Sequence, residues 1–319
     1  MSGRPKGSIA ALVTHVPQIS IGLPVFNGEA YLEATLESLL GQSFGDFEVV
    51  ICDNASTDAS AEILERFAAR DSRIRIHGSE ENRGAAWNYN RAVALARAPY
   101  FKWASHDDLL APEYLACCLQ ALEQSPDAVL AYPRTRRIGP AGEWLDDYDD
   151  RLTLGHERAS QRLRHLLHHM RLCNPVFGLI RRELLLQTGL IGAYVSSDEV
   201  LLVELALRGL FVEVPRRLFL RRVHPGSCFG GGKTLEEVAL WFDPHAELES
   251  FLPRTQKLVH LMLAIEKGPL SELERLRCYA VLLHRWPAQN WRVIAGEWRR
   301  LLLSKMRSIR LPDPQLLSL

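Results

Sequence analysis

The sequence has no surplus of charge of either sign. Its 38 lysine and arginine residues balance its 38 aspartate and glutamate residues. Proteins that bind nucleic acid usually carry a basic excess, so the balance gives no reason to expect nucleic acid as a partner. Any binding that is driven by charge must therefore be local.

Closely spaced cysteine pairs are also missing. The six cysteines are Cys52, Cys117, Cys118, Cys173, Cys228 and Cys278. None of them forms a CxxC motif, which argues against a zinc site and against a disulfide framework. This pattern favours a reducing compartment, and we expect the protein in the cytoplasm.

No uninterrupted hydrophobic run is long enough for a membrane span. The uncharged stretch over residues 7–28 comes nearest, but Pro17, Gln18 and Pro24 interrupt it and its second half alternates as a strand does. We expect residues 1–17 to form a flexible leader that precedes the folded part.

From residue 18 onward, short apolar runs alternate with helical patterns. Strands are expected at residues 18–26, 47–53, 73–78, 100–105 and 128–139. Helical patterns lie between them, the first opening near Asn27 and Gly28. This alternation predicts an α/β fold with a mostly parallel sheet flanked by helices.

The pattern changes toward the C-terminus. After about Leu152 the alternation is less regular, and a glycine-rich run ends at Gly232. Helical patterns dominate from Leu235 onward. We therefore expect an α-helical C-terminal extension over residues 233–319.

Polar residues follow four of the expected strands. These clusters are Pro24–Glu29, Asp53–Asn54, Glu81–Asn90 and His106–Asp108. Ligands of open α/β sheets bind outside the carboxyl ends of the strands, so one crevice is expected to collect all four clusters.

Each cluster also has an ordinary structural interpretation. Asn27 could cap its helix, Asp53 could serve a turn, and Gly84 could simply begin a helix. Two adjacent carboxylates need more explanation, because they repel each other. A hard divalent cation, bound through carboxylate oxygen and substrate phosphates, explains Asp107 and Asp108 better than a solvated helix start does.

Three segments together resemble a large family. They are "ISIGLPVFNGEAYLEATLESLLGQSFGDFEVVICDNASTD", "NRGAAWNYN" and "SHDD", and their order and spacing are more specific than any one of them. The chain resembles the inverting glycosyltransferases of family two over about residues 18–227. This resemblance implies a GT-A fold of Rossmann-like type and a nucleotide-sugar donor. It also implies a domain over residues 18–232, with a nucleotide-sugar half at 18–110 and an acceptor half at 111–232.

The resemblance implies particular donor contacts. Asp53 matches the carboxylate that recognises the base, and Asp107 matches a residue near the diphosphate. The other implied donor contacts are Pro24, Phe26, Asn27, Glu29, Asn82, Arg83, Gly84 and Asn88. Since Asp53 fits uracil recognition in the family, a uridine diphosphate sugar is favoured.

The metal motif of the family reads Asp-x-Asp, and here Ser105 stands in place of the first acid. The resemblance therefore makes Asp107 the first candidate ligand for Mn²⁺ or Mg²⁺, with Asp108 second. His224, in "RRVHPGS", matches a histidine that reaches the metal or the diphosphate. The departure at Ser105 bears on how strongly the reaction depends on metal.

The segment "VSSDEVLLVELALRG" is similar to the one that carries the catalytic base of the family. Asp198 matches the base, Glu199 is the alternate, and Ser197 replaces the more usual glutamate. A capping role is the structural alternative for Asp198. The implied reaction is metal-assisted, inverting transfer of a sugar to a hydroxyl of a glycan, glycolipid or other acceptor. Two alternatives stay open: a nucleotidyltransferase acting on a sugar phosphate, and a non-catalytic nucleotide-sugar binder.

The C-terminal tail is locally basic. Residues 285–310 hold seven lysine and arginine residues against Glu297, together with Trp286, Trp291 and Trp298. Aromatic and basic residues on one helix suit contact with anionic lipid, here the inner face of the plasma membrane. Packing on the domain or in a homodimer is the alternative.

Overall fold

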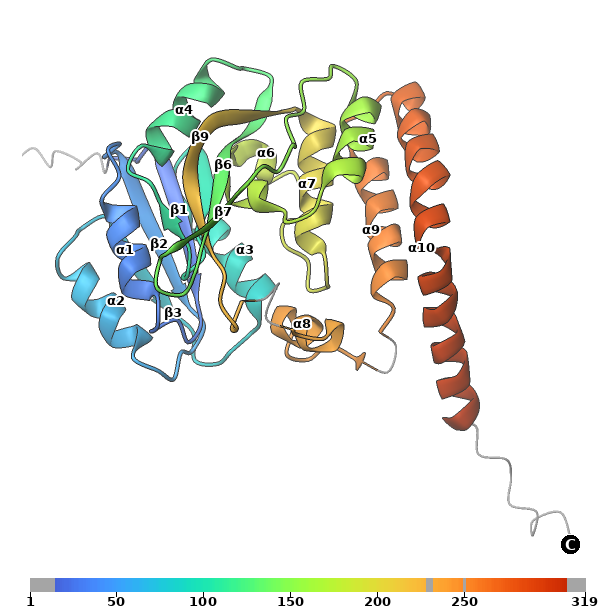
Figure 1. The fold of residues 1–319 in the computed structure, drawn as a ribbon, viewed down its shortest axis with the longest axis horizontal. Helices are drawn as coiled ribbons and strands as arrows, with labels where there is room; N and C mark the ends of the chain where they lie inside the picture. Colours follow the sequence, from blue (N-terminus) through green and yellow to red (C-terminus); the bar gives the residue numbers. More distant parts are fainter. Residues whose placement is uncertain (1–14, 228–231, 249–250, 309–319) are drawn as a thin grey trace, which may run out of the picture.

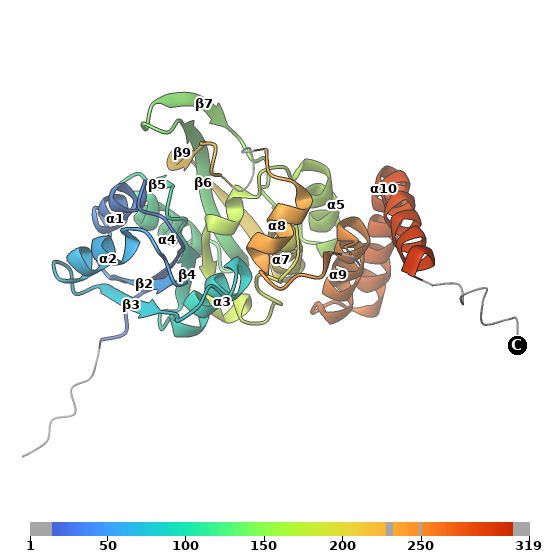
Figure 2. The same cartoon turned by 90° about the horizontal axis from the view of Figure 1, so that it is seen from below.

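The computed structural model of the chain describes residues 15–227, 232–248 and 251–308. Most of the expected leader, residues 1–14, lies outside this part. A single sheet runs through the domain with helices packed on both faces, and the last two long helices lie side by side at one end (Figures 1 and 2).

Within the described residues, nine strands form the sheet. In chain order they are β1 (Ile19–Val25), β2 (Phe47–Asp53), β3 (Ile74–Gly78), β4 (Tyr100–Trp103), β5 (Leu109–Leu110), β6 (Ala128–Ile138), β7 (Trp144–Tyr148), β8 (Leu179–Arg181) and β9 (Leu210–Arg222). Their spatial order is β3-β2-β1-β4-β8-β6-β9-β5, and β7 pairs with β6 at the side.

The first four strands are parallel, as predicted. Strand β1 is buried along its whole length, which explains why it reads as a nearly continuous apolar run. The second half of the sheet is mixed: β6 and β9 run parallel, while β8, β5 and β7 pair antiparallel with their neighbours. Strand β8 has three residues, which is too short for its alternation of buried and exposed residues to be recognised in the sequence.

The helices separate into two layers. In chain order they are α1 (Leu32–Leu40), α2 (Ser60–Ala68), α3 (Ala85–Leu95), α4 (Tyr114–Glu123), α5 (Ala159–His169), the 3₁₀ turn η1 (Asn174–Phe177), α6 (Arg182–Leu185), α7 (Ser197–Arg208), α8 (Leu235–Phe242), α9 (Pro253–Lys267) and α10 (Glu272–Ser308). Helices α1, α2 and α4 bury their apolar faces in one core cluster, and α3, α5 and α7 bury theirs in the other. Alternate residues of β2 enter the two clusters, Val49 on one face and Val50 on the other.

The first helix begins later than the sequence suggested. Its first residue is Leu32 rather than Asn27 or Gly28. Asn27 does not cap it, because its side-chain oxygen accepts a hydrogen bond from the backbone N–H of Thr57 at 2.8 Å. Asn27 also has a positive φ of 49°, so the chain turns there before the helix starts.

Helices α8, α9 and α10 pack onto the same core as α5 and α7. Leu261, Ile265 and Leu282 are fully buried in that cluster. The described part of the extension is therefore helical and shares a core with the sheet domain, while a boundary near residue 232 stays a prediction. None of the helices in the described ranges is long and apolar enough to span a bilayer.

Candidate active site

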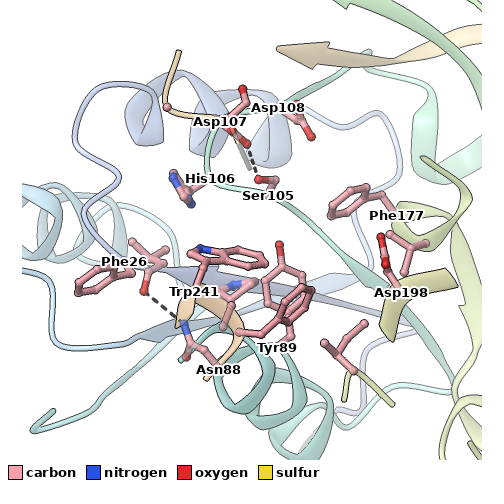
Figure 3. A pocket seen from close by; sticks show the side chains of 18 of the residues that line it. Phe26, Asn88, Tyr89, Ser105, His106, Asp107, Asp108, Phe177, Asp198 and Trp241 are labelled. Atoms are coloured by element: carbon pink, nitrogen blue, oxygen red, sulfur yellow. Dashed lines mark hydrogen bonds between the residues drawn. The ribbon is translucent and has the colours of Figure 1, made fainter. Parts of the chain in front are cut away.

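A cavity of about 430 Å³ opens at the carboxyl ends of β1 and β4. Its walls come from the loops after these strands, from α3 and α8, from the start of α7 and from the end of β9. Figure 3 shows Ser105, His106 and Asp107 at the top of the view and Asp198 at the right, with Trp241 and Tyr89 below them. Parallel strands bring their ends to one edge, so segments far apart in sequence meet here.

Asp107 is held by two side chains. The hydroxyl of Ser105 donates a hydrogen bond to one carboxylate oxygen (Figure 3), and Nε2 of His224 lies 3.0 Å from the other. Burial alone would raise the pKa of Asp107. The hydrogen bond from His224, the charge of His106 and the hydroxyl of Ser105 outweigh burial, so that the pKa is lowered and the carboxylate stays ionised.

Asp108 forms hydrogen bonds that connect strands and helices of the fold. One of its carboxylate oxygens accepts the backbone N–H of Arg222 at 2.8 Å, and its carbonyl accepts the hydroxyl of Thr35 at 3.0 Å. Burial and the neighbouring negative charge of Asp107 raise the pKa of Asp108. These bonds tie the end of β4 to β9 and α1, which makes Asp108 a weaker candidate metal ligand than Asp107.

Asp198 borders the cavity at the first turn of α7. Its oxygen Oδ1 accepts the backbone N–H of Glu199 at 2.9 Å, and Ser196 before it has a left-handed backbone with a φ of 68°. Burial and then the charge of Glu199 raise the pKa of Asp198 to about 6. A carboxylate with that pKa is suited to accept a proton near neutral pH.

Glu199, the alternate base of the sequence, does not line the cavity. Its carboxylate forms an ion pair with Lys257 of α9, whose side chain is only 6% exposed. Consecutive helix residues point about 100° apart, so Asp198 and Glu199 reach different surroundings. Asp198 therefore lines the cavity, whereas Glu199 connects α7 to the helical extension.

Besides Asp107, four of the expected donor residues line the cavity: Pro24, Phe26, Asn82 and Asn88. The amide of Asn88 donates to the carbonyls of Val25 and Cys52, at 3.2 and 2.8 Å, and so fixes the ends of β1 and β2. Its other amide atom, Oδ1, is buried and has no hydrogen-bond partner within the described residues.

The remaining donor candidates lie outside the cavity lining. Asn27 and Glu29 hold the following loop, where Glu29 accepts the backbone N–H of Ala59 at 2.9 Å. Asp53 accepts hydrogen bonds from the hydroxyl and backbone N–H of Ser56. Arg83 stacks over the ring of Trp87 at 4.6 Å, and Gly84 lies against the end of α8. Their contacts with a donor stay predictions.

Sequence reasoning missed several residues of the cavity. Arg221, Lys233 and Trp241 line it, although none was singled out as a site residue. Asn54 was noted only as a strand-end residue, yet its amide donates to Asn82 and to the carbonyl of Gly84. The basic run at the end of β9 was the available signal for Arg221; no local motif marks Trp241.

The residues near Asp107 suit a cation that takes further ligands from a substrate. Among the side chains of residues 15–227, 232–248 and 251–308, no group of three or more His, Cys, Asp or Glu is arranged to hold a metal ion. Asp107 and His224 supply one ionised carboxylate and one imidazole in contact. Mg²⁺ and related ions are commonly bound through one or two carboxylates and the phosphates of a substrate, and this donor set fits that mode.

Known proteins are similar to this chain in sequence. The model of the family described as "Glycosyl transferase family 2" matches residues 20–189, more than half of the chain. A chondroitin synthase of Escherichia coli is 30% identical over 163 residues, which are 51% of this chain and 23% of that protein. A hyaluronan synthase of Pasteurella multocida is 31% identical over 133 residues, which are 42% of this chain and 14% of that protein. The chain spans less than a quarter of the length of the first curated relatives it matches.

Solved structures share the architecture. TarS 1-349 of S. aureus in complex with UDP-GlcNAc superposes with a TM-score of 0.62 at 15% identity, covering 90% of this chain and 79% of that one. Mannosyltransferase PcManGT from Pyrobaculum calidifontis, in complex with GDP-Man and Mn²⁺, gives 0.53 at 18% identity, covering 96% and 79%. At such identities the likeness shows the fold alone. The predicted fold class, a GT-A type sheet with a helical C-terminal region, is confirmed.

Proposed function

The chain belongs to glycosyl transferase family 2, and from that premise we propose that it transfers a sugar from a nucleoside-diphosphate sugar to an acceptor hydroxyl with inversion. The observation that carries the proposal is the placing of Asp107 and Asp198 on the walls of one cavity. Two carboxyl groups with opposite pKa shifts suit two roles, one on the diphosphate and one on the acceptor.

The donor is proposed to lie along the ends of β1, β2 and β4. Phe26, Asn82 and Asn88 border that part of the cavity. A uridine diphosphate sugar is favoured, because Asp53 matches the base-recognising position and the TarS structures hold UDP and UDP-GlcNAc. The GDP-Man complex of PcManGT keeps a guanosine donor as the alternative.

Asp107 and His224 are the residues that would hold Mn²⁺ or Mg²⁺. A bound cation supplies Lewis-acid stabilisation of the negative charge that develops on the diphosphate leaving group. Arg221 and Lys233 line the same cavity, so that two positively charged side chains add to the charge of the cation. Together these groups make a proton donor on the leaving side unnecessary.

Asp198 is proposed as the general base. On the face of the sugar opposite the diphosphate, its carboxylate would take the proton of the acceptor hydroxyl as the oxygen attacks the anomeric carbon in line. The bond to the diphosphate breaks as the new glycosidic bond forms, so the configuration inverts. Base assistance of this kind typically contributes about 10²- to 10⁴-fold in rate.

The acceptor is proposed to bind between Asp198 and the aromatic wall of the cavity. Tyr89, Phe177 and Trp241 line this side (Figure 3). Flat aromatic rings bury large apolar area and leave the polar groups of a ligand free, which suits the faces of a glycan or a lipid-linked sugar. We propose the cytoplasm as the compartment of the reaction, because the free thiols of the described cysteines suit a reducing environment.

A thermal-shift screen of nucleoside diphosphates with and without Mn²⁺ tests the donor site. We expect one base to stabilise the protein, and more strongly with the cation, since a ligand that binds only the folded state raises its stability. Product analysis then tests the reaction class: release of a nucleoside diphosphate supports transfer, and release of pyrophosphate would support a nucleotidyltransferase. Binding without any turnover would leave only a nucleotide-sugar binder.

A further inference from the structure

Helix α10 has a buried face that fastens it to the domain. Cys278, Leu282 and Trp286 are buried in the core cluster shared with α5 and α9. Glu297, only 1% exposed, accepts the backbone N–H groups of Arg254 and Thr255 at 2.8 and 3.0 Å and so caps the start of α9. The position of α10 is therefore fixed as far as its last turns.

A second apolar face of α10 points outward. It consists of Leu276, Leu283, Trp291, Trp298 and Leu302, whose exposed fractions lie between 46% and 65%. At about 100° per residue these five positions fall within an arc of about 100°, so they form one stripe along the helix. Figure 1 shows the last turns of α10 running past the first turn of α9 and away from the sheet. We call these five residues the outer stripe.

The exposed side chains of the second half of α10 include several cations. Arg292, Arg299, Arg300 and Lys305 are exposed, and the guanidinium of Arg292 lies 5.4 Å from the ring centre of Trp291. Between residues 291 and 305 the sequence has a single acid, Glu297, and its carboxylate is turned inward to cap α9. The exposed half of this segment thus carries cations and apolar groups with no exposed acid among its described side chains.

We propose that the outer stripe and its cations dock on the surface of an anionic lipid bilayer. Tryptophan prefers the headgroup level of a membrane, leucine reaches the acyl boundary, and lysine and arginine pair with anionic headgroups. Helix α10 would lie in the plane of the surface. Pairing of two copies through residues 291–305 is disfavoured, because it would bring two sets of cations together where the described side chains include no exposed acid.

Vesicle flotation of the full chain tests this proposal. We expect the protein to float with vesicles of phosphatidylglycerol and phosphatidylcholine, to float less as salt is raised, and to stay behind with pure phosphatidylcholine. The combined change Arg292→Gln, Arg299→Gln and Arg300→Gln is expected to weaken partitioning on the order of a hundredfold, since each cation near the surface contributes about fivefold. The combined change Trp291→Ser and Trp298→Ser is expected to abolish most of the binding.

Trp144→Ser is the matched control, because Trp144 is 64% exposed but lies on β7. Binding that falls equally in this control would overturn the proposal, as would a failure of the unaltered chain to bind anionic vesicles at low salt. Sedimentation supplies the third outcome: a dimer that dissociates when Trp291 and Trp298 are changed would make the outer stripe an interface between copies. Thermal unfolding checks that each variant is folded. None of these measurements depends on sugar transfer, so the result for membrane docking is independent of the proposed function.

Discussion

Nε2 of His224 lies 3.0 Å from a carboxylate oxygen of Asp107, although 117 residues separate them in the chain. The contact exists because β9 returns to the edge of the sheet at which β4 ends. Tyr31 packs against the imidazole at 4.7 Å between ring centres and holds it from the side of α1. Asp107 is thus positioned by both halves of the sheet, and the candidate cation site depends on the whole domain being folded.

The first prediction concerns this contact. Asp107→Asn keeps the shape of the side chain but removes its charge, and we expect the Mn²⁺-dependent part of nucleoside-diphosphate binding to fall by about 10²-fold or more. Ser105→Ala removes only a group that orients the carboxylate, and it should cost at most about 10- to 100-fold. Calorimetric titration of the diphosphate with and without Mn²⁺ measures both. Equal cation dependence in the unaltered protein and in Asp107→Asn would contradict the assignment.

The second prediction concerns the activity of Asp198. Because burial and Glu199 raise its pKa to about 6, the rate of transfer should rise through about pH 6 and level off above it. Asp198→Asn should lower the turnover number by about 10²- to 10⁴-fold while donor affinity stays unchanged. Steady-state kinetics and donor titration on the same samples provide the measurement. Unchanged turnover would exclude Asp198 as the base.

The same pKa shift predicts a change in stability with pH. The folded state holds the proton of Asp198 more tightly than the unfolded state, whose pKa is near the ordinary value of 3.8. Below about pH 4 Asp198 is protonated in the folded protein and its raised pKa does not lower the free energy of unfolding. Between about pH 4 and pH 6 the free energy of unfolding falls, and above pH 6 the loss reaches about 3 kcal/mol. Asp198→Asn removes this loss, so the variant should be more stable than the unaltered protein at pH 7 and not at pH 4. Urea unfolding at the two pH values checks this.

Particular residues show which parts of this arrangement could be predicted from sequence. Asp107 and Asp198 could be found because each stands beside an element boundary that the apolar pattern marks. Trp241 could not be found, since its place depends on how α8 folds back over the sheet after a glycine-rich run. Likewise, the choice between Asp198 and Glu199 rests on Lys257, which lies 58 residues beyond Glu199 in the chain.

The strand order has the same limit. The first four strands are joined by helices of clear period, and their parallel pairing follows from that alternation. Strand β8 has three residues and β5 has two, which is too few to show a period of two. The antiparallel half of the sheet is therefore set by long-range pairing with β6 and β9, whose energies no local pattern reports.

The third prediction separates the two neighbouring acids. Glu199→Gln leaves the ammonium of Lys257 buried without its partner, and we expect a loss of about 3–5 kcal/mol in the free energy of unfolding. The double change Glu199→Gln and Lys257→Met should recover most of this loss, because no unpaired charge remains. Urea unfolding of Glu199→Gln, Lys257→Met and the double variant completes a double-mutant cycle, which gives the interaction free energy of the pair.

The kinetics of Glu199→Gln give an independent check. Removing the charge of Glu199 removes one cause of the raised pKa of Asp198, so the midpoint of the pH–rate curve should move below about 6. Turnover above pH 7 should stay within a small factor of that of the unaltered protein. A collapse of turnover at every pH, in a variant shown to be folded, would instead make Glu199 the base.

The last prediction concerns the contact that seats α8 over the cavity. Gly84 has a φ of 82°, and a Cβ there would lie 2.4 Å from the carbonyl oxygen of Phe242 and 2.7 Å from Pro244. Gly84→Ala must therefore shift α8, which carries Trp241 into the proposed acceptor site. We expect a higher KM for the acceptor, a smaller change in donor affinity, and a loss of stability beyond the roughly 1–3 kcal/mol of the backbone alone.

Gly232 supplies the matched control for that variant. Its φ is 78°, close to that of Gly84, but a Cβ at this position would meet no atom of the described residues within 4 Å. Gly232→Ala therefore carries a backbone cost of similar kind without touching α8, and the difference between the two variants reports the contact itself. If both variants changed the acceptor KM equally, the seating of α8 on Gly84 would have no part in acceptor binding, and Trp241 would lose its proposed role.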